Sequence, residues 1–137
     1  MSNADLRILL GDGSTFDILD GVTMTAGDWQ HVAATVDTVN NTFSIYKDGD
    51  HVFTEAIDTI SSHATSSRSI EIGRMDNAPS PSYFDGEISD VRIWDDVRSA
   101  SEIKDNYQQR LDNASNESGL SAYWRFDDVT SQGTSPD

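Results

Sequence analysis

The chain has 137 residues, of which 36% are hydrophobic and 9% aromatic, a composition that suits one domain with a single core. It carries 24 Asp and Glu against 9 Lys and Arg, and the formal net charge of −15 repels phosphate backbones and anionic membranes. We therefore expect no nucleic acid partner. The lack of cysteine excludes a disulfide framework and thiolate chemistry. No run approaches the roughly 18 to 20 apolar residues of a membrane helix, so we expect no membrane insertion.

The first half of the chain alternates short apolar runs with turn signals, which is typical of antiparallel strands. Residues 6–10 and 14–19 flank Gly11-Asp-Gly13 and predict a hairpin that ends at the turn Asp20-Gly21. Three further strands are expected between glycine and asparagine turns, at residues 29–37, 42–47 and 51–57.

Residues 83–94 combine a glycine-marked entry with a period-two pattern that leads into a helix start. Read as one strand, this stretch places Phe84 and Trp94 on one face and Val91 and Ile93 on the other. Because both faces carry apolar residues, we expect a strand near the centre of a sheet. A short strand at residues 70–72 and a long loop at 74–81 precede it.

One helix is expected, at residues 99–111. Ser99 can cap it, and Glu102 three residues later completes a capping box. Ile103, Tyr107 and Leu111 follow at the spacing of a buried stripe. After a polar stretch, residues 120–126 alternate again, with Leu120, Ala122, Trp124 and Phe126 on one face, and predict the last strand.

These elements predict an all-β fold, an antiparallel two-sheet β-sandwich with one short C-terminal helix. We assign the sandwich to residues 5–126 and a flexible tail to residues 127–137, where almost nothing is available to bury. Residues 1–4 have no basic or hydrophobic segment and are interpreted as an expression remnant. Any export signal would lie outside this sequence.

Several motifs resemble those of the laminin-G-like jelly-roll domain of the concanavalin A-like lectin/glucanase superfamily. They occur in the family's order across roughly residues 6 to 111: Gly27-Asp-Trp-Gln-His-Val-Ala-Ala-Thr35, Ile45-Tyr-Lys-Asp-Gly49, Ile72-Gly73, Phe84-Asp-Gly-Glu-Ile-Ser-Asp-Val-Arg-Ile-Trp94 and Ser99-Ala-Ser-Glu-Ile103. The resemblance implies a jelly-roll sandwich used for ligand binding or adhesion, often in tandem on secreted or surface proteins of bacteria, and commonly with calcium.

The chain departs from the family in the position of one strand. A segment similar to Gly119-Leu-Ser-Ala-Tyr-Trp-Arg-Phe-Asp-Asp128 usually opens a domain of this family, whereas here it comes last. The chain therefore looks like the end of one repeat joined to the first strand of the next, or like a permuted domain that this strand closes. We expect it to pair in the sheet that contains Val91 and Ile93, and a second open sheet edge predicts a homodimer.

No catalytic pair is expected, and the chain is interpreted as a non-enzyme. Glucanases of this superfamily need paired carboxylates that face one cleft from alternate strand positions. Glu87 and Asp90 are three residues apart, so on a strand they would point to opposite faces.

Calcium is the expected cofactor. The resemblance implies a calcium site at the loop rim, and the metal ligands proposed for it are Asp12, Asp76 and Asn77, which carry the oxygen donors that this cation prefers. A second set would pair Asp90 with Asp127 if their strands are neighbours. The alternative is that these residues form turns and supply solubilising charge.

A ligand site is expected at the same rim, built from Asp76, Asn77, Tyr83 and Asp85. Tyr83 is the aromatic expected to be exposed, whereas Trp29, Trp94 and Trp124 lie at apolar positions of strands and are expected in the core. The predicted function is a non-catalytic module that binds a carbohydrate or an extracellular protein. The alternative is a structural spacer with no ligand of its own.

Overall fold

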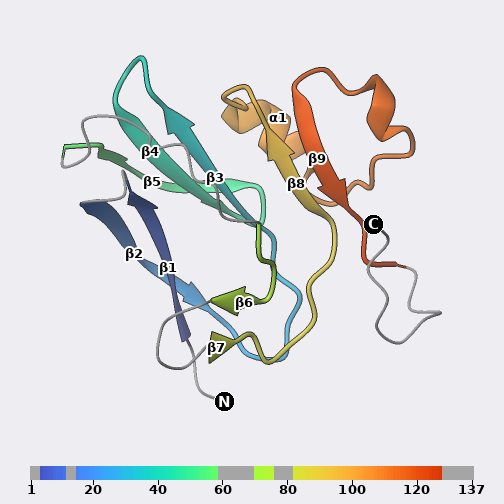
Figure 1. Cartoon of the computed structure of the whole chain (residues 1–137), viewed down its shortest axis with the longest axis horizontal. Coiled ribbons are helices and arrows are strands. Elements are labelled where there is room, and N and C mark those ends of the chain that lie inside the picture. Colours follow the sequence, from blue (N-terminus) through green and yellow to red (C-terminus); the bar gives the residue numbers. More distant parts are fainter. Residues whose placement is uncertain (1–3, 12–14, 59–69, 76–81, 128–137) are drawn as a thin grey trace. The chain divides into compact units, whose positions relative to one another are not determined.

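The computed structural model describes residues 4–11, 15–58, 70–75 and 82–127. These residues form nine strands, one α-helix and one short 3₁₀ helix (Figure 1). They divide into two compact units. The first comprises the described residues of 1–65 and 96–110, and the second those of 66–95 and 111–137.

The first unit begins with the predicted hairpin, formed by β1 (Ala4–Gly11) and β2 (Phe16–Met24). We expected β2 to end at a turn made by Asp20-Gly21, but the strand continues to Met24. The two residues form a β-bulge instead, because the register shifts where they lie opposite Arg7. The Arg7 guanidinium pairs there with the Asp20 carboxylate at 2.7 Å.

The next three predicted strands form a second antiparallel sheet in the order β3 (Val32–Asp37), β4 (Thr42–Lys47) and β5 (Asp50–Ala56). The turn between β3 and β4 is fixed by the Asp37 carboxylate, which accepts hydrogen bonds from the backbone amides of Val39 and Asn40. The strand predicted at residues 29–37 starts only at Val32. Trp29, which we expected in the core, lies before the strand with 66% of its surface exposed, so that prediction is wrong.

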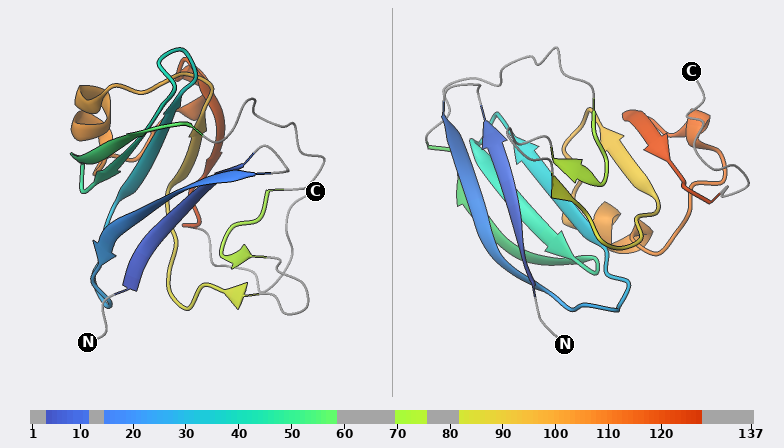
Figure 2. Two further views of the ribbon diagram at one scale, coloured as in Figure 1. Left: turned by 90° about the vertical axis from the view of Figure 1, so that its left-hand side faces the viewer. Right: turned by 60° about the horizontal axis from the view of Figure 1, so that its bottom comes forward.

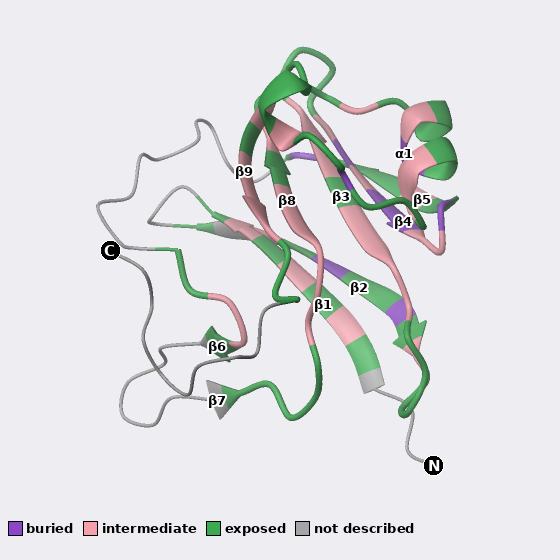
Figure 3. Ribbon diagram, turned by 90° about the vertical axis from the view of Figure 1, so that its right-hand side faces the viewer, coloured by how far each residue is buried: buried purple, intermediate pink, exposed green. Residues whose placement is uncertain are grey.

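The two sheets of this unit pack face to face as a β-sandwich. Figure 2 shows the β1–β2 ribbon lying across the β3–β4–β5 sheet, and Figure 3 shows buried residues on β2 and β4. The core consists of Leu19, Val22, Phe43, Ile45 and Ile57. Phe43 and Ile45 are the largest fully buried side chains among the described residues, so β4 provides the centre of the core.

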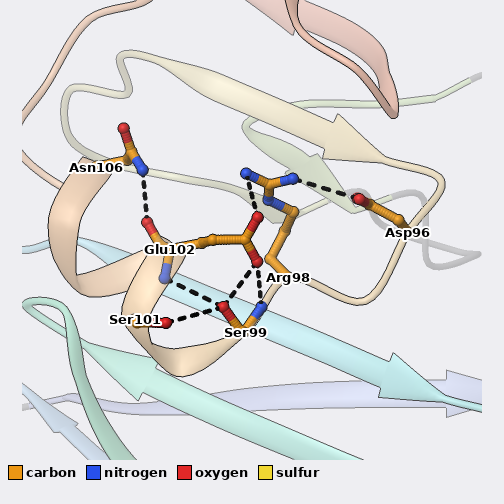
Figure 4. Close-up of polar contacts among 6 residues, drawn as sticks. All are labelled: Asp96, Arg98, Ser99, Ser101, Glu102 and Asn106. Atoms are coloured by element: carbon orange, nitrogen blue, oxygen red, sulfur yellow. Dashed lines mark hydrogen bonds and ion pairs between the residues drawn. The ribbon is translucent and has the colours of Figure 1, made fainter.

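The predicted helix is present but shorter than expected: α1 runs from Ala100 to Asn106. The capping box is confirmed, because the Ser99 hydroxyl accepts from the Glu102 amide while the Glu102 carboxylate accepts from the Ser99 amide (Figure 4). The side-chain amides of Asn106 and Gln109 donate to the carbonyls of Glu102 and Asp105. These bonds satisfy carbonyls at the end of the helix, and the helix stops before Leu111.

Helix α1 docks on the turn between β4 and β5. The Lys104 ammonium bonds the Asp50 carboxylate at 2.7 Å, and the Tyr107 ring meets the His31 ring edge to face. Gly49 lies beneath Tyr107, where an added Cβ would come within 2.6 Å of the ring. A glycine is therefore required at position 49, both for this approach and for its positive φ of 78°.

The second unit differs from the single strand that we predicted over residues 83–94. It contains β6 (Arg74–Met75), β7 (Ser82–Tyr83) and β8 (Val91–Trp94), and no strand forms between Phe84 and Asp90. Asp90 has a φ of 61°, which is incompatible with an extended strand. The strand expected at residues 70–72 is also absent, and β6 begins only at Arg74.

The last predicted strand, β9 (Leu120–Trp124), pairs with β8 in an antiparallel ladder, which confirms the predicted pairing. The 3₁₀ helix η1 (Ala114–Asn116) precedes it. The ladder stops where both chains turn: Asp90 and Phe126 each have a positive φ, and the Asp90 amide donates to the Arg125 carbonyl at 3.3 Å. Phe126 therefore does not extend the apolar face as expected.

The capping box predicts a pH dependence of stability. The pKa of the Glu102 carboxyl is lowered first by the hydrogen bond from the Ser99 amide, then by the Ser99 hydroxyl and the Arg98 charge. Because folding lowers this pKa, the ionised carboxylate stabilises the folded state at pH values above the pKa that it has in the unfolded chain, near 4.5. This stabilisation is lost as the pH falls through the lower pKa of the folded state. Glu102→Gln should thus reduce the dependence of unfolding free energy on pH in this acid range.

Urea unfolding at pH values from neutral to about one unit below the ordinary glutamate pKa would measure this dependence. Glu117→Gln is the matched control, since that exposed side chain has no partner among the described residues. Equal slopes for both variants and the parent chain would mean that the Glu102 charge does not stabilise the helix.

The β8–β9 ladder predicts how the chain responds to loss of its last strand. Removing residues 120–137 leaves β8 without its partner, so amide protection of Val91–Trp94 against hydrogen exchange should be lost. Protection of β3–β4–β5 is the internal control, because that sheet belongs to the other unit. Unchanged protection of β8 would show that β9 is not needed to order it.

Candidate functional site

Two of the predicted ligand residues, Asp76 and Asn77, lie outside the described residues, in the loop between β6 and β7. The structure does place both ends of that loop: Arg74 pairs with Tyr83 and Met75 with Ser82 in a short antiparallel ladder (Figure 1). The ladder therefore brings Tyr83 beside the strand that leads into the loop. Tyr83 is exposed as predicted, and its role as a ligand residue stays a prediction.

Two adjacent aromatic side chains are exposed here, with 71% of Tyr83 and 61% of Phe84 accessible to solvent. The Phe84 amide donates to the Gly73 carbonyl at 2.8 Å, which anchors the chain as it leaves β7. The Phe84 ring then folds over Gly86, where an added Cβ would lie 2.7 Å from the ring. The backbone around Tyr83 is thus held on both sides while its ring stays accessible.

Asp85 completes this surface, which we call the β7 rim and define by Tyr83, Phe84 and Asp85. Asp85 is exposed, and its carboxylate makes no hydrogen bond or ion pair within the described part of the chain. An accessible carboxylate beside an aromatic ring can accept hydrogen bonds from a ligand while the ring contacts an apolar face. The β7 rim therefore has the chemistry of a binding surface.

A further exposed aromatic lies in the first unit, and sequence reasoning missed it. Trp29 sits in the connection between β2 and β3, where the alternating pattern of residues 29–37 suggested a core position. The signal that it lies before the strand is Gly27, whose φ of 90° marks a turn two residues earlier.

Comparison of the chain with models of protein families gives one match. The family model described as the concanavalin A-like lectin/glucanases superfamily, laminin G type, matches residues 1–104. The chain belongs to this family. No curated protein and no solved structure matches the chain. The predicted resemblance is thereby confirmed, and the sandwich of the first unit agrees with the family's laminin-G-like jelly roll.

The match ends within α1, so β9 lies beyond the matched residues. Among the described residues, no helix is long and apolar enough to cross a membrane.

The predicted calcium ligands are only partly placed by the structure. Asp12, like Asp76 and Asn77, lies outside the described residues. Asp90 and Asp127 flank the same end of the β8–β9 ladder, but each is held by an arginine, Asp90 by Arg92 and Asp127 by Arg125, at 2.7 and 2.8 Å. Each carboxylate is thus engaged by an arginine, and the pairing of Asp90 with Asp127 around a cation stays a prediction.

Within the ranges that the structure describes, no three or more His, Asp or Glu side chains are grouped so that they could hold a metal ion. The predicted loop ligands Asp12, Asp76 and Asn77 lie outside these ranges, so the calcium site stays a prediction.

The two carboxylates weighed for catalysis are also separated by their surroundings. Glu87 is exposed in the segment before β8, whereas Asp90 is half-buried in its ion pair with Arg92. The Arg92 guanidinium also lies over the Tyr123 ring, 5.5 Å from its centroid, which fixes this group between β8 and β9. Asp90 thus has a structural role in the second unit.

Proposed function

We propose that this laminin-G-like domain is a non-catalytic binding module that recognises a carbohydrate or protein ligand at the β7 rim. The observation that carries the proposal is the exposed pair Tyr83 and Phe84 next to the exposed Asp85 carboxylate, which has no partner among the described residues. Asp76 and Asn77 would extend this site from the adjoining loop. Membership of a superfamily of lectin type supports binding as its general role.

The β7 rim suits a ligand with both an apolar face and hydrogen-bond donors. An aromatic ring stacks on the C–H face of a sugar or on an apolar side chain, and a carboxylate accepts from hydroxyl or amide groups. The net charge of −15 disfavours anionic ligands such as sulfated sugars. A neutral oligosaccharide or an uncharged protein loop therefore fits the rim best.

The absence of catalysis is part of the proposal. It is supported by the placement of Glu87 outside a strand and by the engagement of Asp90 with Arg92, which leave these two acids without a shared cleft face. Secretion or display at the cell surface is proposed with it, because domains of this family are typically extracellular.

The first test is a glycan array probed with the whole chain in calcium buffer. We expect binding to a neutral glycan, and Tyr83→Ala should weaken it about tenfold, a loss of the size expected when a stacked aromatic contact is removed. Phe126→Ala is the matched control, since Phe126 is also an exposed aromatic of the second unit. No hit across a broad panel of glycans and extracellular proteins would favour the spacer alternative.

Calcium is proposed as a ligand of the loops at positions 12 and 76–77. Binding to the native state raises its stability by RT ln(1 + [L]/Kd), or about 2.7 kcal/mol at a hundredfold excess over Kd. Thermal unfolding with millimolar calcium and with chelator would measure the shift, and Asp76→Ala should remove it. Asp112→Ala, which changes an exposed acid in another loop, is the control. Identical melting with calcium and chelator would eliminate the calcium proposal.

A further inference from the structure

The connection between β2 and β3 is held by one side chain. The Gln30 carboxamide accepts from the Thr25 amide at 3.0 Å and donates to the Thr25 carbonyl at 2.7 Å. The same nitrogen lies 3.3 Å from the Asp28 carbonyl. Gln30 thus closes residues 25–30 into a ring of hydrogen bonds, and we call this segment the Trp29 loop.

Trp29 projects from this loop with two-thirds of its surface exposed. No ring or cation of the described residues contacts its indole. A Trp side chain would normally be buried for its large apolar area, so a rigid loop that presents one to solvent indicates a contact surface. Because the loop is already ordered, a partner would not have to supply the cost of ordering it.

Asp28 precedes Trp29 and gives the loop a charge. It is exposed, and its carboxylate has no hydrogen bond or ion pair within the described part of the chain. The whole chain carries a net charge of −15, which attracts positively charged partners. Among aromatic side chains, Trp binds a cation over its ring face most strongly, and an adjacent carboxylate can pair with the same cation.

We propose that Trp29 and Asp28 form a binding site for an arginine or lysine side chain of a partner protein. The guanidinium or ammonium group would lie over the indole face and pair with the Asp28 carboxylate. This site belongs to the first unit, whereas the β7 rim belongs to the second, so the inference does not depend on the proposed function. A neutral sugar would gain the stacking contact but nothing from the charge of the domain.

The test uses the whole chain and an end-capped peptide of glycine and arginine, with the same peptide carrying glutamine in place of arginine as control. Nuclear magnetic resonance would follow the Trp29 indole N–H signal during the titration. We expect a saturable shift with the arginine peptide only. Trp29→Ala should weaken binding about three- to fivefold, which corresponds to a cation–π contact at an exposed site.

Asp28→Asn should weaken binding about twofold, since surface ion pairs contribute little, and the remaining affinity should depend less on salt. Asp58→Asn is the matched control, because it removes one exposed carboxylate of the same unit elsewhere. The amide spectrum of β3 should be unchanged in all three variants, which checks that they fold.

Two outcomes would overturn the inference. If Asp58→Asn weakens binding as much as Asp28→Asn while Trp29→Ala has no effect, the net charge alone holds the peptide. If the Trp29 signal responds to a neutral oligosaccharide and not to the arginine peptide, the loop is a sugar site. Loss of glycan binding in Tyr83→Ala with peptide binding intact would show that the two surfaces act separately.

Discussion

The first unit depends on the burial of β4 from both faces. Phe43 and Ile45 point into the sandwich core, while Tyr46, on the opposite face of the strand, is also buried. A strand with apolar residues on both faces needs a layer on each side. The β1–β2 hairpin supplies the first layer. The sheet around β4 therefore has to be covered on its other face as well.

Helix α1 is stabilised by its contacts with the rest of the unit rather than by its own helix propensity. Seven residues are too few for a helix to persist alone in water, since helices shorter than about 12 residues are marginal. The capping box satisfies its first amides, and the contact of Tyr107 with Gly49 and the bond from Lys104 to Asp50 dock it on the β4–β5 turn. A local sequence signal and a tertiary contact thus act on the same short segment.

The sequence predicted those parts of the fold that local chemistry determines. Turn residues located the hairpin β1–β2 and the sheet β3–β4–β5, and the Ser99–Glu102 spacing located the start of α1.

The alternation of apolar and polar residues failed as a signal at residues 83–94, because it does not register the left-handed backbone at Asp90. It failed again at Trp29, because alternation does not register the turn before β3 that the Gln30 side chain closes by bonding Thr25. Of the residues predicted for the ligand site, Tyr83 is exposed as expected, because it follows a loop whose Asp, Asn and Pro residues are typical of the surface. Its role in binding stays a prediction.

Exposed aromatic side chains do not contribute the hydrophobic stabilisation that their burial would give. Burial of an aromatic side chain of about 150–250 Å² stabilises the folded state by on the order of 3 kcal/mol. Trp29 and Tyr83 are mostly exposed and contribute little of this stabilisation. At each position the backbone is fixed by contacts that the aromatic ring does not make: the Gln30 side chain orders one loop, and the Phe84 amide bond to Gly73 anchors the other segment. Since neither ring is needed to hold its own backbone, both are available to a partner. A ligand that covers them recovers the hydrophobic energy without reorganising the domain, and the charge of −15 disfavours anionic ligands at both surfaces.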